Sequence, residues 1–133
     1  MTLAEFLLVR IAEDEDVARR AAFGWGEGWT SKMNGEWGTV HADGKRNMVG
    51  CEDGDVTRHI AIHDPARVLA ECEAKRRLVA AHEVNCIGVH TWPFTDLEIR
   101  ADRAGVDVGL WAAIGYSALP YADHPDYLPE WEQ

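Results

Sequence analysis

Apolar residues recur every three to four positions along the first part of the chain, the spacing of one face of a helix. Thr2 stands before this run and Glu5 stands three residues later, which is the spacing of a capping box at a helix start. A glycine-rich segment at 24–28 then interrupts the pattern. The sequence therefore predicts an amphipathic helix over residues 2–22. Its buried face is expected to contain Leu3, Phe6, Leu7 and Ile11.

A second helix is predicted to begin at Asp64 and Pro65. An Asp side chain accepts the unpaired N–H groups of a first helical turn, and Pro at the first helical position loses no hydrogen bond. The helical period continues to about Val84, with two favourable Glu–Lys or Glu–Arg pairs four residues apart, namely Glu71–Lys75 and Glu73–Arg77. We expect this helix to pack on the N-terminal helix and on a helix near Gly109. The side chains expected to be buried there are Val68, Leu69, Cys72 and Val79.

Two short segments, 36–40 and 47–51, are typical of β-strands, and Asp43-Gly44 between them is a hairpin signal. Asp55 or Thr57 is expected to cap a brief helix that ends at Ile62.

A last helix is predicted over residues 109–121. Beyond it, Pro125 and Pro129 exclude regular helix, whereas residues 85–104 give no consistent pattern. With 133 residues, 47% of them hydrophobic, the chain has enough apolar surface for one core. The sequence predicts a single α+β domain over residues 1–133. This domain is expected to be mostly helical, with three to four helices packed on a small antiparallel hairpin or sheet.

The net charge is −10, from 23 acidic and 13 basic residues. This balance argues against direct nucleic-acid binding, which needs a basic face to neutralise phosphates. The segment from Ala104 to Gln133 has five carboxylates and no Lys or Arg. Two interpretations stand: the acidity aids solubility, or it offers an acidic surface to a basic partner.

Cysteine content and hydropathy bear on the compartment. Cys51, Cys72 and Cys86 are odd in number and widely spaced, so no disulfide framework is predicted. The N-terminal segment lacks the basic region of a signal peptide, and no apolar run approaches the ~20 residues of a membrane span. We expect a cytoplasmic protein that does not enter a membrane.

Cysteine and histidine are the ligands that zinc prefers, and His82, Cys86 and His90 are spaced four apart. A structural zinc site is usually closed by four ligands, and this segment offers three. We therefore expect no metal or other cofactor, with zinc at these three residues as the alternative. His59 and His63 form a second pair, but two histidines alone are a weak signal. His63 is instead expected to pack or hydrogen-bond at the helix junction beside Asp64.

Six tryptophans are many for a chain of this size. Tryptophan fills cores and also anchors interfaces. We assign Trp25, Trp37, Trp92 and Trp111 to the core. Trp29 and Trp131 are better placed as exposed anchors, and Tyr127 and Trp131 lie in the acidic tail as either a docking peptide or a strap over the body. The strap is favoured. The candidates for protein binding are Trp29, Asp123, Asp126, Tyr127 and Trp131.

The common sequence motifs of enzymes are not found in this chain. The chain has no phosphate-binding loop, and its glycine-rich segment at 24–28 misses the dinucleotide fingerprint. Residues 115–119 lack the last glycine of a nucleophile elbow. No catalytic residue is assigned, and no enzymatic activity is expected.

Three segments carry a resemblance: HIAIHDPARVLAECEAKRRLV (59–79), TWP (91–93) and ALPYADHPDYLPEW (118–131). They resemble an uncharacterised family of small proteins from actinobacteria and their phages. The layout of the chain is also similar, more weakly, to early-region proteins of temperate phages. Relatives tend to carry cysteine pairs between the long helix and the Leu-Pro-Tyr element, whereas Cys86 stands alone here. The resemblance thus implies a metal site that has decayed, and it implies no activity.

These observations lead to two functional hypotheses. The first is a small acidic protein-interaction module for a partner with a basic surface, which the resemblance would make a phage or mobile-element accessory protein acting on a host factor. The second is a degenerate zinc-type accessory domain linked to nucleic acid. The identity of the partner, mimicry of nucleic acid by the acidic surface and a homo-oligomer are left open by the sequence.

Overall fold

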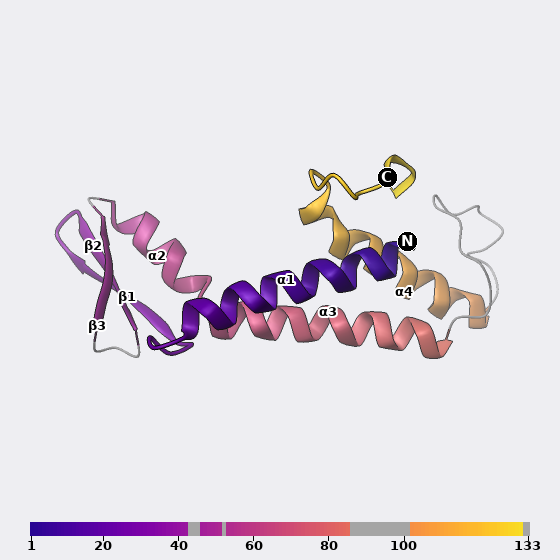
Figure 1. Cartoon of the computed structure of the whole chain (residues 1–133), viewed down its shortest axis with the longest axis horizontal. Coiled ribbons are helices and arrows are strands. Elements are labelled where there is room, and N and C mark those ends of the chain that lie inside the picture. The colour runs from indigo at the N-terminus through magenta and orange to yellow at the C-terminus, as the bar shows by residue number, and fades with distance from the viewer. Residues whose placement is uncertain (43–45, 52, 86–101, 132–133) are drawn as a thin grey trace. The chain divides into compact units, whose positions relative to one another are not determined.

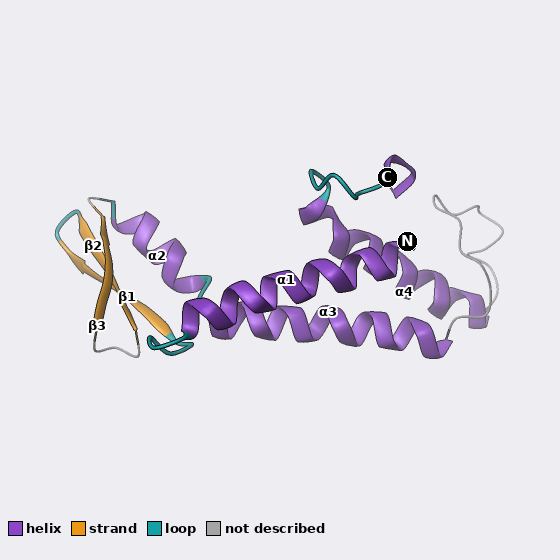
Figure 2. Ribbon diagram, in the orientation of Figure 1, coloured by secondary structure: helices purple, strands orange, loops and turns teal. Residues whose placement is uncertain are grey.

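The structure, a computed structural model, describes residues 1–42, 46–51, 53–85 and 102–131. The described residues form four α-helices, three strands and two short 3-10 turns (Figure 1, Figure 2). In chain order these are α1 (Leu3–Ala22), β1 (Trp29–Asn34), β2 (Trp37–Ala42), β3 (Arg46–Cys51), α2 (Gly54–Ile62), α3 (Pro65–Asn85), α4 (Asp102–Ala118), η2 (Leu119–Tyr121) and η3 (Pro129–Trp131). The mostly helical α+β class is confirmed.

Contacts between residues divide the chain into two compact units. Unit 1 comprises residues 1–12 and 73–133, and unit 2 comprises residues 13–72. The borders fall inside α1 and α3, so each of these helices contributes one part to each unit. The expectation of a single domain stays a prediction, and each unit is described on its own. Among the described residues, no helix is long and apolar enough to cross a membrane.

The predicted capping box closes the start of α1 in unit 1. The Thr2 backbone N–H donates to Glu5 Oε2 at 2.6 Å, and the Glu5 N–H donates to Thr2 Oγ1 at 3.2 Å. The hydrogen bond from the Thr2 backbone N–H and, to a smaller degree, the interaction with the Thr2 hydroxyl hold the pKa of the Glu5 carboxyl below its ordinary value.

The core of unit 1 is built from the apolar face of α1 together with residues of α3 and α4. The ring of His82 on α3 lies 5.2 Å from the indole of Trp111 on α4, so these two helices touch. Burial confirms the predicted face of α1 and the predicted positions of Val79 and Trp111. The buried residues of this core include Leu3, Phe6, Leu7, Ile11, Val79, Trp111, Ile114 and Ala118.

Unit 2 contains a three-stranded antiparallel sheet in the order β1-β2-β3. The predicted hairpin corresponds to β2 and β3, although its turn at Asp43-Gly44 lies outside the described residues. The strand β1 was not predicted, because Trp29–Asn34 shows no alternation of apolar and polar residues. A register shift interrupts the β2–β3 ladder between Val40 and His41.

Helix α2 covers one face of this sheet (Figure 1). Glycines allow the close approach: a Cβ atom at Gly38 would lie 2.9 Å from the Cα of Gly54 and would also meet the Thr57 hydroxyl. Thr57 is fully buried and donates to the Gly54 carbonyl at 2.9 Å. Neither Asp55 nor Thr57 caps α2. The cap is Asp53, whose Oδ1 accepts the Asp55 N–H at 2.9 Å.

Two predictions of burial in unit 2 are wrong. Trp37 is 46% exposed, because it lies on the face of the sheet opposite α2, where its indole covers Gly50. Val68 and Leu69 on α3 are only partly buried, whereas Cys72 is buried as expected. Trp25 is partly buried, and Trp92 lies outside the described residues.

Candidate functional site

An open cavity of about 420 Å³ lies within unit 2. We call it the Trp29 groove, because Trp29 contributes the largest side chain among its lining residues. One wall comes from the second half of α1 and the other from the start of α3, with β1 and the α2–α3 junction at the end. The lining residues are Asp14, Val17, Ala18, Ala21, Trp29, His63, Pro65, Val68 and Glu71.

The position of Trp29 is fixed by the start of α3. Its backbone N–H donates to Asp64 Oδ2 at 3.1 Å, while its indole Nε1 donates to the Gly26 carbonyl at 3.1 Å. The Ala66 N–H donates to the Glu27 carbonyl at 3.1 Å. These bonds hold residues 26–29 against the first turn of α3, so the indole has a defined place in the groove.

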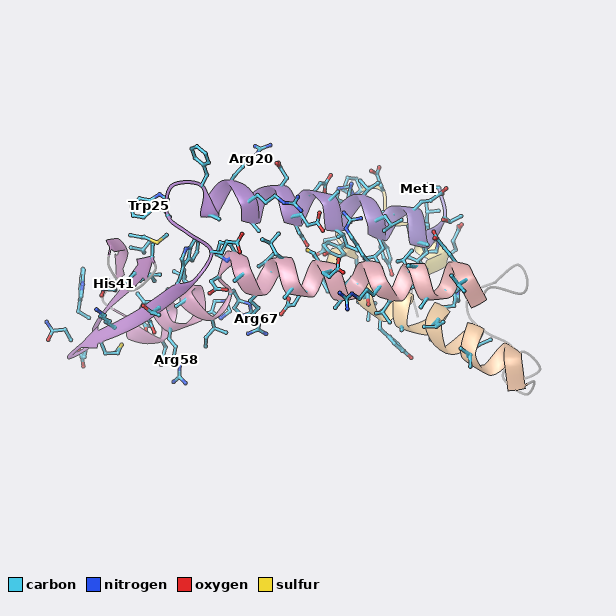
Figure 3. All side chains as sticks on the ribbon, turned by 90° about the horizontal axis from the view of Figure 1, so that it is seen from below. Met1, Arg20, Trp25, His41, Arg58 and Arg67 are labelled. Atoms are coloured by element: carbon cyan, nitrogen blue, oxygen red, sulfur yellow. The ribbon has the colours of Figure 1, made fainter. Side chains whose placement is uncertain are left out.

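Asp64 caps α3 as the sequence predicted. Its Oδ1 accepts the Arg67 N–H at 2.9 Å, which is the bond of an N-cap residue. Arg67 projects outward from the first turns of α3 (Figure 3) and its Nε pairs with Glu71 at 2.7 Å. Of the two ion pairs predicted on this helix, Glu73–Arg77 forms at 2.8 Å.

The groove combines an apolar floor with two carboxylates. Val17 is 66% exposed, so its side chain is accessible from solvent. Asp14 on α1 and Glu71 on α3 stand among the lining residues. The lining thus places apolar side chains next to two acidic ones.

His63 lies at the helix junction, where it was expected to pack or hydrogen-bond. Its backbone N–H donates to the His59 carbonyl at 3.2 Å, and its exposed ring packs on that of His59 with 4.5 Å between the ring centroids. The two histidines share one face of α2, as predicted for a helical segment.

The C-terminal segment 119–131 packs in unit 1 and forms the strap that the sequence favoured. Tyr127 and Trp131 are buried, with their rings 5.6 and 5.3 Å from Phe6. Tyr127 Oη donates to the Trp131 carbonyl at 3.0 Å, and Lys75 Nζ donates to Tyr121 Oη at 2.9 Å. In this arrangement the Tyr127 and Trp131 side chains are part of the core of unit 1, and their role in partner binding stays a prediction.

Asp123 and Asp126 are exposed on the strap. The backbone N–H of Asp126 donates to His124 Nδ1 at 3.1 Å, and the other ring nitrogen of His124 contacts the buried guanidinium of Arg10. The Asp126 Oδ2 also lies 3.8 Å from His124 Nδ1, so this carboxylate is close to the ring that holds this part of the strap in place.

The predicted zinc ligands are only partly described. His82 is buried beside Trp111, and Cys86 and His90 lie outside the described residues. Within the part of the chain that the structure describes, no three His, Cys, Asp or Glu residues converge as metal ligands. The alternative zinc site stays an untested prediction.

A family model matches residues 1–133, which is the whole chain, and its description is a family of unknown function, DUF6221. The chain belongs to this family. No curated protein and no solved structure matches it. The expected membership in an uncharacterised family is thus confirmed, and the family supplies no activity or site residue to this member.

Sequence reasoning found Trp29 but missed the other residues of the groove. They come from α1, the α2–α3 junction and α3, and they are neighbours only after folding. One signal was available in the sequence, because Val17 directly follows the acidic run 13–16.

Proposed function

We propose that this chain is a small acidic protein-interaction module, and that the Trp29 groove binds a segment of a partner protein that carries an apolar side chain next to a Lys or Arg. The observation that carries this proposal is that one cavity is lined by the exposed Val17 and the partly buried Trp29 together with the carboxylates of Asp14 and Glu71. Aromatic side chains in pockets are frequent anchors of protein interfaces.

Charge supports a basic partner. The net charge of −10 attracts a positive surface over a long range and raises the rate of encounter at low salt. At the groove itself, the Arg67–Glu71 pair is exposed, with about half of each side chain open to solvent. An exposed pair of this kind contributes at most about 1 kcal/mol, so a partner's Lys or Arg can replace Arg67 at little cost.

The experiment uses the full chain and two synthetic helical peptides of equal length, one of Leu and Lys and one of Leu and Glu. Isothermal titration calorimetry is expected to show binding of the Leu/Lys peptide that weakens as salt rises. The double variant Asp14→Asn/Glu71→Gln is expected to weaken this binding about three- to tenfold.

The matched control is Glu83→Gln/Glu130→Gln, which removes the same charge from exposed positions outside the groove. It is expected to change the affinity less than twofold, as a long-range effect of net charge alone. Equal binding of both peptides, or equal losses in the two double variants, would contradict the proposal.

Two further parts of the proposal rest on sequence alone. The resemblance to phage early-region proteins would make the partner a host factor, and the chain itself is proposed to have no catalytic role. The alternative function, a degenerate zinc-type domain linked to nucleic acid, rests on His82, Cys86 and His90. Metal analysis of the purified chain with these three residues substituted tests that alternative.

A further inference from the structure

His59 and His63 are held together at the end of α2. His59 lies in the last turn of the helix, and His63 is the C-cap, whose backbone N–H donates to the His59 carbonyl at 3.2 Å. Both side chains are exposed. Their ring centroids lie 4.5 Å apart, with 51° between the ring planes.

This separation matches that of two imidazoles bound to one metal ion. A zinc–nitrogen bond of about 2.0–2.1 Å puts each ring centroid about 3.2 Å from the ion. Two such rings at right angles around the ion have centroids about 4.5 Å apart, and at a tetrahedral angle about 5.2 Å. By the separation of their centroids, the two rings are therefore as close together as two imidazoles on one ion.

The ring nitrogens are available for this role. Among the described residues, none makes a hydrogen bond with a ring nitrogen of His59 or His63. Neutral imidazole is the commonest metal ligand in proteins, so two unengaged rings at this distance form a bidentate donor.

The surroundings favour a cation. His63 lines the Trp29 groove together with Asp14 and Glu71, and the net charge of the whole chain is −10. A divalent cation is attracted by this field. The groove beside His63 leaves room for water molecules at the coordination positions of the ion that the histidines do not occupy.

We propose that His59 and His63 bind one Zn²⁺ ion, with water completing its coordination. The proposal does not depend on partner binding in the groove. It also differs from zinc at His82, Cys86 and His90, which belong to unit 1.

The test is a calorimetric titration of the full chain with Zn²⁺. One equivalent is expected to bind, and His59→Gln or His63→Gln is expected to weaken that binding at least tenfold, since loss of even an outer-shell partner typically costs about 10–100-fold. Both positions are exposed, so the variants should fold, which circular dichroism checks. His41→Gln, a histidine on the sheet whose Nε2 already lies 2.8 Å from Thr39 Oγ1, is the matched control and should bind as the native chain does.

The double variant Cys86→Ser/His90→Gln separates the two sites. If the proposal is correct, this variant still binds the one equivalent of Zn²⁺ that His59→Gln no longer binds. Zn²⁺ then also perturbs the ring resonances of His59 and His63 in NMR spectra. Absence of binding, binding unchanged by both single variants, or binding lost only with Cys86 and His90 would overturn it.

Discussion

The carboxylate of Asp64 accepts the backbone N–H of Trp29 at 3.1 Å, across 35 positions of sequence. Its other oxygen accepts the Arg67 N–H at 2.9 Å and so caps α3. One side chain thus caps α3 and also holds the first residue of β1 against the start of that helix. The Trp29 groove depends on this double role, because it sets where the indole lies.

Asp64→Ala is expected to destabilise the chain by about 1–3 kcal/mol, since it removes a helix cap and leaves the Trp29 N–H without its acceptor. Asp64→Asn keeps one oxygen acceptor and should lose less. Urea unfolding, followed by circular dichroism, measures both. If Asp64→Ala lost no more stability than Asp64→Asn, the hydrogen bond that the remaining oxygen of the Asn side chain can accept would contribute nothing.

The strap is expected to stabilise unit 1. Trp131 is 7% exposed and lies against Phe6, so Trp131→Ala should cost about 3–5 kcal/mol, and truncation after Pro120 should cost at least as much. Glu130→Ala, next to it and exposed, is the control and should change stability by less than about 0.5 kcal/mol. A truncated chain with an unchanged melting temperature would show that residues 121–133 are a docking peptide after all.

Glycine substitutions should have opposite effects at two positions. Gly38→Ala would press a methyl group onto Gly54 and Thr57, and overpacking of this kind costs about 1–3 kcal/mol. Gly109→Ala in α4 meets no atom within 4 Å and should stabilise by about 0.5–1 kcal/mol. Thermal unfolding of the two variants measures both changes in stability. If Gly38→Ala were neutral, α2 would not approach the sheet as closely as described.

The capping box makes stability depend on pH. Because the folded pKa of Glu5 is lowered, its contribution is present above the unfolded pKa and is lost as the pH falls below about 4.3 toward the lowered value. Glu5→Gln removes this dependence. The difference in melting temperature between the native chain and Glu5→Gln should therefore shrink between about pH 5 and pH 3. A difference that is constant over this range would contradict the assignment.

Local signals made much of the fold predictable. The capping box at Thr2 and the Asp64-Pro65 helix start depend on residues a few positions apart, so sequence spacing is enough to find them. The strand β1 was missed because its half-exposed residues lack an apolar alternation, and α4 begins several residues before the predicted start at 109.

Tertiary relationships were less accessible. Trp37 was assigned to the core because it is large and apolar, but only the sheet's register reveals that it lies on the uncovered face. The groove brings Asp14 of α1 together with Glu71 of α3, and helical periodicity relates only residues within one helix. The burial of Tyr127 and Trp131 agrees with the strap that was favoured from the sequence. Prolines exclude a regular helix in this segment, and large aromatic side chains gain stability when they are buried.

Site-directed photo-crosslinking tests the central claim, that the Trp29 groove binds a basic apolar segment, most directly. A photoreactive phenylalanine analogue replaces Val17 in the groove or, as the control, Tyr116 on α4, since the two positions are 66% and 58% exposed. Each full-length variant is irradiated with the Leu/Lys peptide and analysed by mass spectrometry. The account predicts a peptide adduct at position 17 and little or none at position 116. Equal yields at the two positions, or a greater yield at position 116, would contradict it.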